Sequence, residues 1–232
     1  MKRRIGIAIA LVVALIAGRL MLTGEFQNVL AAQPAAANPG ALGPSTSIQV
    51  DGVTDIDPHK AFGSKSAPVV MEIFSDYQCP ACRTLFLTTN RLLMDNYVTT
   101  GKVYVVHRDF PLPMHAYSRV AARYARAAAE LGKVEAVEKA LFESQDKWEQ
   151  TGDVDGTVAA ALTPAEMTKV RALVKGGTLE PLIDKDYELG QMYRVNQTPT
   201  SVFHYKGQTY PYSGVMSYEI LRQFLDQLLS QK

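Results

Sequence analysis

The sequence predicts an α/β domain from segments that differ in their hydrophobic pattern. Residues 69–75 (VVMEIFS) are a short, mostly apolar run typical of a strand covered on both faces, and residues 102–110 (KVYVVHRDF) predict a second strand. Residues 114–195 are expected to form several helices. Residues 200–212 (TSVFHYKGQTYPY) predict a hairpin, which completes a sheet accompanied by many helices.

Residues that typically begin or end helices and turns set the limits of the remaining expected elements. A helix is expected at residues 80–97, because its proline lies in the first turn, where no amide hydrogen is needed. Glycines are expected to break the helical region near Gly132, Gly152, Gly156 and the pair Gly176-Gly177. The hairpin is expected to turn at Lys206-Gly207, and Ser217 is expected to cap a closing amphipathic helix.

Composition and charge narrow the classes of function. The 232 residues are 47% hydrophobic and 20% charged, which suffices for one core of ~150 to 200 residues. The first 24 residues carry four basic side chains and no acid, so the rest of the chain holds 20 basic and 23 acidic side chains. This balance gives no basic surface, and nucleic acid is therefore not an expected partner.

The segment at residues 1–24 is expected to direct export. Basic residues precede an uncharged run at residues 5–18, which fits the apolar core of a signal peptide. Residues 5–22, with a snorkelling arginine, approach the length of an N-terminal membrane anchor, and both interpretations stay open. Either one predicts a periplasmic or other extracytoplasmic location, with or without anchoring to the inner membrane. Residues 25–47, rich in Ala, Pro and Gly, predict a flexible linker before a folded domain at 48–232.

The chain has two cysteines, Cys79 and Cys82, at the start of the first expected helix. A helix N-terminus presents unpaired amide hydrogens and the positive end of the helix dipole, which favour a thiolate on Cys79. Cys82 lies about one turn further along the same face, close enough to form a disulfide. The spacing predicts a thiol-disulfide exchange pair, with Cys79 as the attacking sulfur and Cys82 as the resolving sulfur.

Other interpretations of the cysteine pair explain fewer of its features. A structural disulfide around so small a loop would restrict the unfolded chain little. Zinc prefers four ligands, whereas the sequence has no second cysteine pair and no histidines at ligand spacing, so no metal site and no cofactor are expected. Copper bound by two thiolates stays open as a non-catalytic alternative.

Three stretches together resemble the DsbA-like branch of the thioredoxin superfamily, the exported thiol-disulfide oxidoreductases. They are APVVMEIFSDYQCPACRTLF at residues 67–86, VYVVHRDFPLPMH at 103–115 and QTPTSVFHYKGQTYPYSG at 197–214. The resemblance implies a thioredoxin-like fold with a helical insertion at about residues 114–195. It also implies a cis peptide bond before Pro199, which would face the cysteines, and a substrate contact through the backbone of Thr198.

Three further residues are candidates for the site. Glu72 interrupts an apolar strand, and members of the resembled family often carry a buried acid that exchanges protons with the resolving cysteine, here Cys82. That acid usually lies six residues before the first cysteine, where this chain has Ile73, so Glu72 points to the other face unless the following loop absorbs one residue. An acid that points into solvent or pairs with a lysine stays open as the alternative. Tyr77 and Gln78 directly precede the first cysteine and are expected to contact substrate.

The function expected from these residues is the introduction of disulfides into exported proteins through a mixed disulfide. The strongest oxidants of the resembled family carry a histidine before the second cysteine, whereas this chain has Ala81, so a milder oxidant is expected. The expected partners are unfolded or reduced exported proteins and a membrane redox partner, either a quinone-linked thiol oxidase or an electron donor. A reductase or isomerase of the same fold, and a copper- or peptide-binding module without turnover, stay open as alternatives.

Overall fold

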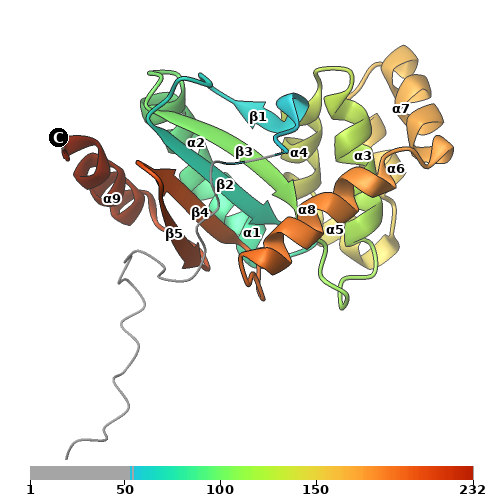
Figure 1. The fold of residues 1–232 in the computed structure, drawn as a ribbon. Coiled ribbons are helices and arrows are strands. Elements are labelled where there is room, and N and C mark those ends of the chain that lie inside the picture. Colours follow the sequence, from blue (N-terminus) through green and yellow to red (C-terminus); the bar gives the residue numbers. More distant parts are fainter. Residues whose placement is uncertain (1–52, 54, 232) are drawn as a thin grey trace, which may run out of the picture. The chain divides into compact units, whose positions relative to one another are not determined.

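The computed structural model describes residue 53 and residues 55–231 (Figure 1). The signal peptide or anchor expected at 1–24 and the linker expected at 25–47 lie outside the described residues. Within the described part of the chain, no helix is both long and apolar enough to cross a membrane. The first regular element there is a short 3₁₀ turn, η1, at Pro58–Lys60.

The described residues contain five strands in one mixed sheet, in the order β1-β3-β2-β4-β5. β2 and β3 run parallel, and the other neighbouring pairs are antiparallel. The two predicted strands are confirmed to within one residue, and the hairpin turns as predicted at Lys206-Gly207, where both residues have positive φ. The strand bounds are Ala61–Phe62 for β1, Val69–Ser75 for β2, Val103–Asp109 for β3, Thr200–Tyr205 for β4 and Gln208–Ser213 for β5.

Helices follow β2, separate β3 from β4 and close the described chain (Figure 1). The helix predicted at 80–97 is a continuous helical run to Val98 in which two segments, η2 and η3, are wider π turns. The helices α3 to α8 occupy the place predicted for the insertion. The bounds are Pro80–Leu85 for α1, Phe86–Asn90 for η2, Arg91–Leu93 for α2, Met94–Val98 for η3, Ser118–Ala129 for α3, Val134–Glu143 for α4, Gln145–Thr151 for α5, Val154–Ala159 for α6, Pro164–Gly176 for α7, Glu180–Met192 for α8 and Tyr218–Ser230 for α9.

The glycines of the insertion end helices at most of the predicted positions. Gly152 and Gly177 follow α5 and α7 with positive φ, as is typical of helix C-termini. The break predicted at Gly156 is wrong, because this residue lies inside α6. Its amide there donates to Oδ1 of the N-cap residue Asp153 at 2.8 Å, so this glycine belongs to a helix start.

Different helices cover the two faces of the sheet (Figure 1). On one face, Met71 and Ile73 pack in a core with residues of the helical run at 80–98 and of α9. On the other face, Phe74 packs with Tyr193 and with residues of α8. Because successive side chains of a strand point to opposite faces, β2 contributes to both cores and is buried along its length.

A network of buried charges joins the sheet to the insertion. Arg126 of α3 pairs with Asp109 at the end of β3 and with Asp186 of α8, while Arg108 of β3 pairs with Asp186 at 3.0 Å. Among the described residues the network contains three cations and three carboxylates, Lys60, Arg108, Arg126, Glu72, Asp109 and Asp186. Buried charges are tolerated when each has an opposite partner with good geometry, and this network meets that condition.

Gly190 marks a tight contact between α8 and the sheet. A Cβ at this position would lie 2.5 Å from Cε2 of Phe110, whose ring stacks on Tyr187 and so has little room to move. We expect Gly190→Ala to lower the free energy of unfolding by about 1–3 kcal/mol in urea denaturation, because it overpacks this contact.

Gly176 of α7 provides the matched control. Apart from its chain neighbours and the backbone of its own helix, no described residue has an atom within 4 Å of a Cβ built there, so Gly176→Ala should leave stability unchanged or raise it by about 0.5–1 kcal/mol. Equal stability of the two alanine variants would contradict the close packing of α8 on Phe110.

Candidate active site

The two cysteines lie at the N-terminus of α1, after the loop that follows β2. Pro80 occupies the first turn, and Cys79 is the N-cap residue with extended backbone angles of φ −78° and ψ 121°. Both residues are free thiols, Cys79 being 7% exposed and Cys82 only 1%. Cys79 is therefore the sulfur nearer to solvent, and Cys82 lies behind it.

The loop before β4 contacts Cys79. The peptide bond between Thr198 and Pro199 is cis, as the resemblance implied, and Thr198 is buried. The carbonyl oxygen of Thr198 lies 3.4 Å from Cys79 Sγ. The amide of Gly214, just after β5, donates to the carbonyl of Pro199 at 2.7 Å. The structure thus brings Thr198 and Pro199 to the cysteine pair, although 119 residues separate Cys79 from Thr198 in the sequence.

The pKa values of the two thiols are shifted in opposite directions. A hydrogen bond from the Cys82 thiol is the largest cause of a Cys79 pKa lowered to about 5, and it outweighs the effect of burial. Hydrogen bonds from the backbone amides of Ala81 and Cys82 add to it, as expected at a helix N-terminus. Burial, and then the neighbouring Cys79, raise the pKa of Cys82. At neutral pH the site therefore holds a thiolate on Cys79 and a protonated thiol on Cys82.

Asp76 ties the cysteine loop to the loop that follows β3. Its buried carboxylate accepts the backbone amides of Gln78 and Leu112, both at 2.8 Å, and pairs with Nδ1 of His115 at 2.7 Å. Its own amide donates to Cys82 Sγ at 3.4 Å. The sequence analysis missed Asp76, although an aspartate two residues before an amide it can bind is a common turn signal.

The structure places Tyr77 and Gln78 differently from the expected substrate contacts. Tyr77 is 2% exposed, and its hydroxyl donates to Oε1 of Glu138 at 2.7 Å. This side chain therefore lies in the interior, and its geometry does not support the substrate contact expected of Tyr77. Gln78 is half-buried, and its side-chain carbonyl accepts the amide of Tyr117 at 2.8 Å. Both side chains fasten the loop to the insertion.

Glu72 is buried, but the structure does not bring it to the cysteines. Its carboxylate binds Nε of Arg108 at 2.8 Å and Nε2 of His204 at 2.8 Å, and no hydrogen bond between described residues joins it to either sulfur. Ile73 and not Glu72 faces the helical run that begins at the cysteines. The loop after β2 does not absorb the one-residue difference, so Glu72 lies on the opposite face and its geometry does not support proton exchange with Cys82.

Gln145 of α5 is a second residue that the sequence analysis missed. Its side chain is buried in the interior and its amide nitrogen Nε2 lies 2.7 Å from the carbonyl of Tyr77 and 3.1 Å from that of Cys79. Its distance from the cysteines in sequence explains why no local pattern points to it. Only the packing of the insertion on the loop reveals the contact.

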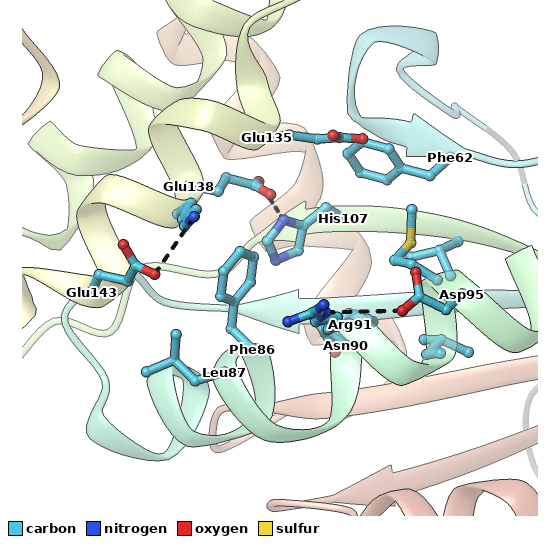
Figure 2. Close-up of a pocket in the computed structure, with 15 residues that line it drawn as sticks. Phe62, Phe86, Leu87, Asn90, Arg91, Asp95, His107, Glu135, Glu138 and Glu143 are labelled. Carbon is cyan, nitrogen blue, oxygen red and sulfur yellow. Dashed lines mark hydrogen bonds and ion pairs between the residues drawn. The ribbon is translucent and has the colours of Figure 1, made fainter. Parts of the chain in front are cut away.

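A cavity of about 480 Å³ lies beside the helical run that follows the cysteines (Figure 2). It is bounded by the helical run at 86–95, the sheet and α4, and Figure 2 shows His107 paired with Glu138 at its edge. The charge of His107 helps to keep the pKa of Glu138 below its usual range even though burial acts in the opposite direction. Neither cysteine lines the cavity, so the contact of Glu138 with Tyr77 is what connects it to the loop.

The shifted pKa of Cys79 leads to a titration prediction. The thiolate absorbance of the reduced protein at 240 nm should titrate near pH 5, and Cys82→Ala should raise this pKa because the thiol donor is lost. Cys82→Ser keeps a hydroxyl donor, so its Cys79 pKa should remain closer to that of the wild type. An unchanged pKa in Cys82→Ala would contradict the role of that hydrogen bond.

The same shift predicts how stability depends on pH. Because the folded pKa lies below the unfolded value of about 8.5, the Cys79 thiolate stabilises the reduced fold fully above that value. This contribution is lost as the pH falls through about 5, which can be measured as the stability difference from Cys79→Ser.

Glu72 is expected to act on stability and not on the thiols. Glu72→Gln removes one carboxylate from Arg108, which keeps its pair with Asp186. We therefore expect the free energy of unfolding in urea to fall by about 3 kcal/mol, and the titration of Cys79 to stay unchanged. Glu219→Gln, at an exposed carboxylate that pairs with Arg222, is the control and should change stability by less than about 1 kcal/mol. A shift of the thiol titration in Glu72→Gln would restore the proton-exchange role.

Comparisons with known proteins agree with this geometry. A family model described as Thioredoxin matches residues 56–227. The probable disulfide bond formation protein D of Bacillus cereus is 38% identical over 52 residues, which are 22% of this chain and 24% of that protein. The chain spans less than a quarter of the length of the curated relatives it matches first.

Solved structures show the same fold. A thioredoxin-like oxidoreductase from Silicibacter pomeroyi superposes with a TM-score of 0.62 at 25% identity, over 76% of this chain and 95% of that chain. The α-DsbA1 protein of Wolbachia pipientis superposes with a TM-score of 0.61 at 18% identity, over 73% and 89%. The chain therefore belongs to the thioredoxin family.

Proposed function

We propose that this protein is an exported oxidase that passes a Cys79–Cys82 disulfide to reduced substrate proteins. The observation that carries the proposal is the opposite shift of the two thiol pKa values, with Cys79 at about 5 and Cys82 raised. A stabilised thiolate stabilises the reduced form of the pair, and a stable reduced form makes the disulfide form an oxidant.

The proposed reaction uses the oxidised pair and two substrate thiols. A substrate thiolate attacks Cys79 Sγ, the bond between the two cysteine sulfurs breaks, and Cys82 leaves as a thiolate that takes up a proton. A second substrate thiolate then attacks the substrate sulfur of the mixed disulfide, and Cys79 leaves as a thiolate. The substrate has lost two electrons to the cysteine pair, and the low pKa of Cys79 makes it a good leaving group.

Thr198 and Pro199 are proposed to receive the substrate backbone. Thr198 lies against Cys79, so an extended segment paired with its backbone would carry a cysteine to the attacking sulfur. Main-chain pairing of this kind does not depend on the substrate side chains, which suits a protein that acts on many reduced chains. We propose no substrate contact for Tyr77, and for Gln78 only a role in fixing the loop.

The proposed location and partners follow from the N-terminal sequence and from electron balance. Residues 1–24 have the basic start and apolar run of an export signal, or of an anchor in the inner membrane through residues 5–22. Each turnover leaves two electrons on the cysteine pair, so a redox partner must remove them. A membrane thiol oxidase linked to quinones would fill this role, whereas an electron donor would be needed if the protein acted as a reductase or isomerase.

The reduction potential of the soluble domain, equilibrated against glutathione, tests the direction of electron flow. We expect a value between about −120 and −180 mV, as for disulfide-donating relatives of thioredoxin. The oxidised wild-type protein should form the disulfide of a reduced two-cysteine peptide, and Cys79→Ala should not form it. Cys82→Ala should accumulate the mixed disulfide with the peptide once its Cys79 is activated. A potential near about −270 mV would mean a reductant. If the wild type shows no turnover and Cys79→Ala loses only copper affinity, the protein is a binding module.

A further inference from the structure

Gln145 reaches the cysteine loop from a helix of the insertion. It is the first residue of α5, 66 residues after Cys79, and is 2% exposed. Its Nε2 donates to the carbonyl of Tyr77 at 2.7 Å and to that of Cys79 at 3.1 Å. The side-chain amide of glutamine has two N–H groups, and here each has a carbonyl acceptor. Reversing the amide would set its oxygen against two carbonyl oxygens, so these partners fix its orientation.

The position of Gln145 is fixed by the core of the insertion. Trp148, one turn further along α5, is buried and donates from Nε1 to the carbonyl of Leu141 at 2.7 Å. Tyr77 and Cys79 belong to the same hydrophobic core as Trp148. The amide donor is therefore held by a rigid support, and it can fix the loop that it binds.

The two carbonyls that Gln145 binds flank Gln78 and bracket the backbone that leads into Cys79. The Cys79 carbonyl also accepts the amide of Arg83 at 3.1 Å, so it is the first acceptor of the α1 helix. Carbonyl oxygens carry partial negative charge, and a donor on each of them lowers the negative potential around the nearby sulfur. The same donors fix the backbone that sets the distance from Cys79 Sγ to Thr198.

We propose that Gln145 is a positioning residue for thiol-disulfide exchange: its side-chain amide fixes the carbonyls of Tyr77 and Cys79 and thereby the attacking sulfur at the start of α1. This role rests on the oxidase function proposed above, but it makes a separate claim about Cys79. The insertion then serves the chemistry directly, because one of its helices supplies a group that touches the catalytic loop.

Two variants of the full domain test the proposal. Gln145→Glu has the same shape but replaces both donors by a carboxylate, and Gln145→Met keeps the size while removing the donors without adding charge. For each reduced protein, the pKa of Cys79 is measured from the pH dependence of its alkylation by iodoacetamide. The oxidised proteins are then assayed with a reduced two-cysteine peptide.

We expect Gln145→Glu to raise the pKa of Cys79 by about one unit, and Gln145→Met to raise it by less. At pH 7 a rise of one unit weakens the reduced form about tenfold, which moves the reduction potential about 30 mV more negative. Peptide oxidation should slow by about threefold, because Cys79 becomes a poorer leaving group as its pKa rises.

Gln150 provides the matched control on the same helix. It is exposed, and its Nε2 donates to the carbonyl of Asp146 at 2.8 Å, away from the cysteine loop. Gln150→Glu should leave the pKa, the potential and the rate as in the wild type. Unchanged values in both Gln145 variants, even with a lower melting temperature, would overturn the proposal, because a merely structural residue would change stability only.

The proposed function can fail without the inference failing. If the wild type does not oxidise the peptide but both Gln145 variants still raise the Cys79 pKa, the oxidase function is wrong and the positioning role stands. If Gln145→Glu does not fold, Gln145→Met alone decides, since it preserves the volume and places no charge in the core.

Discussion

The buried ion network is the constraint on which the rest of the structure depends. It joins η1, two strands of the sheet, α3 and α8 through carboxylates and cations that have almost no contact with solvent. Removing one partner would leave a buried charge without compensation, which is far more costly than losing a contact at the surface. The insertion therefore cannot rotate over the sheet by small steps, since any such rotation would separate Arg126 from Asp109 or Asp186.

This constraint reaches the cysteine loop through Tyr77. Lys60, which pairs with Asp109, also lies 3.4 Å from the Tyr77 hydroxyl, and Glu138 of α4 accepts that hydroxyl. Burial and the neighbouring Glu138 raise the pKa of Tyr77, so it remains a hydrogen-bond donor at any physiological pH. The loop is thus fixed by its tyrosine side chain, by the side-chain amide of Gln145 and by the carboxylate of Asp76. Loops at active sites are often mobile, whereas this one is fastened on three sides.

The sequence allows prediction of those parts of the fold that depend on local chemistry. The apolar run of β2, the hairpin turn at Lys206-Gly207 and the N-cap at Ser217 each follow from a few neighbouring residues, and the structure contains all three. The cysteine pair could likewise be placed at a helix start from its spacing and from Pro80. The cis bond before Pro199 could not be derived from the residues, and only the family resemblance indicated it.

The errors share one physical origin, which is contact between segments far apart in sequence. Whether Tyr77 faces a substrate or the interior depends on Glu138, 61 residues later, and the role of Gln145 depends on where α5 packs. Glu72 illustrates a subtler case, because it interrupts an apolar strand and is buried there. The face to which it points follows from the pleat, and its partners Arg108 and His204 come from two other strands.

In the proposed reaction, the unequal burial of the two sulfurs would also determine how long a substrate stays bound to Cys79. While the substrate is joined to Cys79, the only nearby competitor for it is the Cys82 thiol, which burial keeps protonated. A protonated thiol is a poor nucleophile, so premature release of the substrate in its reduced state is slow. The proposed mixed disulfide would therefore persist until a second substrate cysteine arrives. Under this proposal, substrates whose paired cysteines are far apart in sequence, and meet only late in folding, would gain most from a long-lived mixed disulfide.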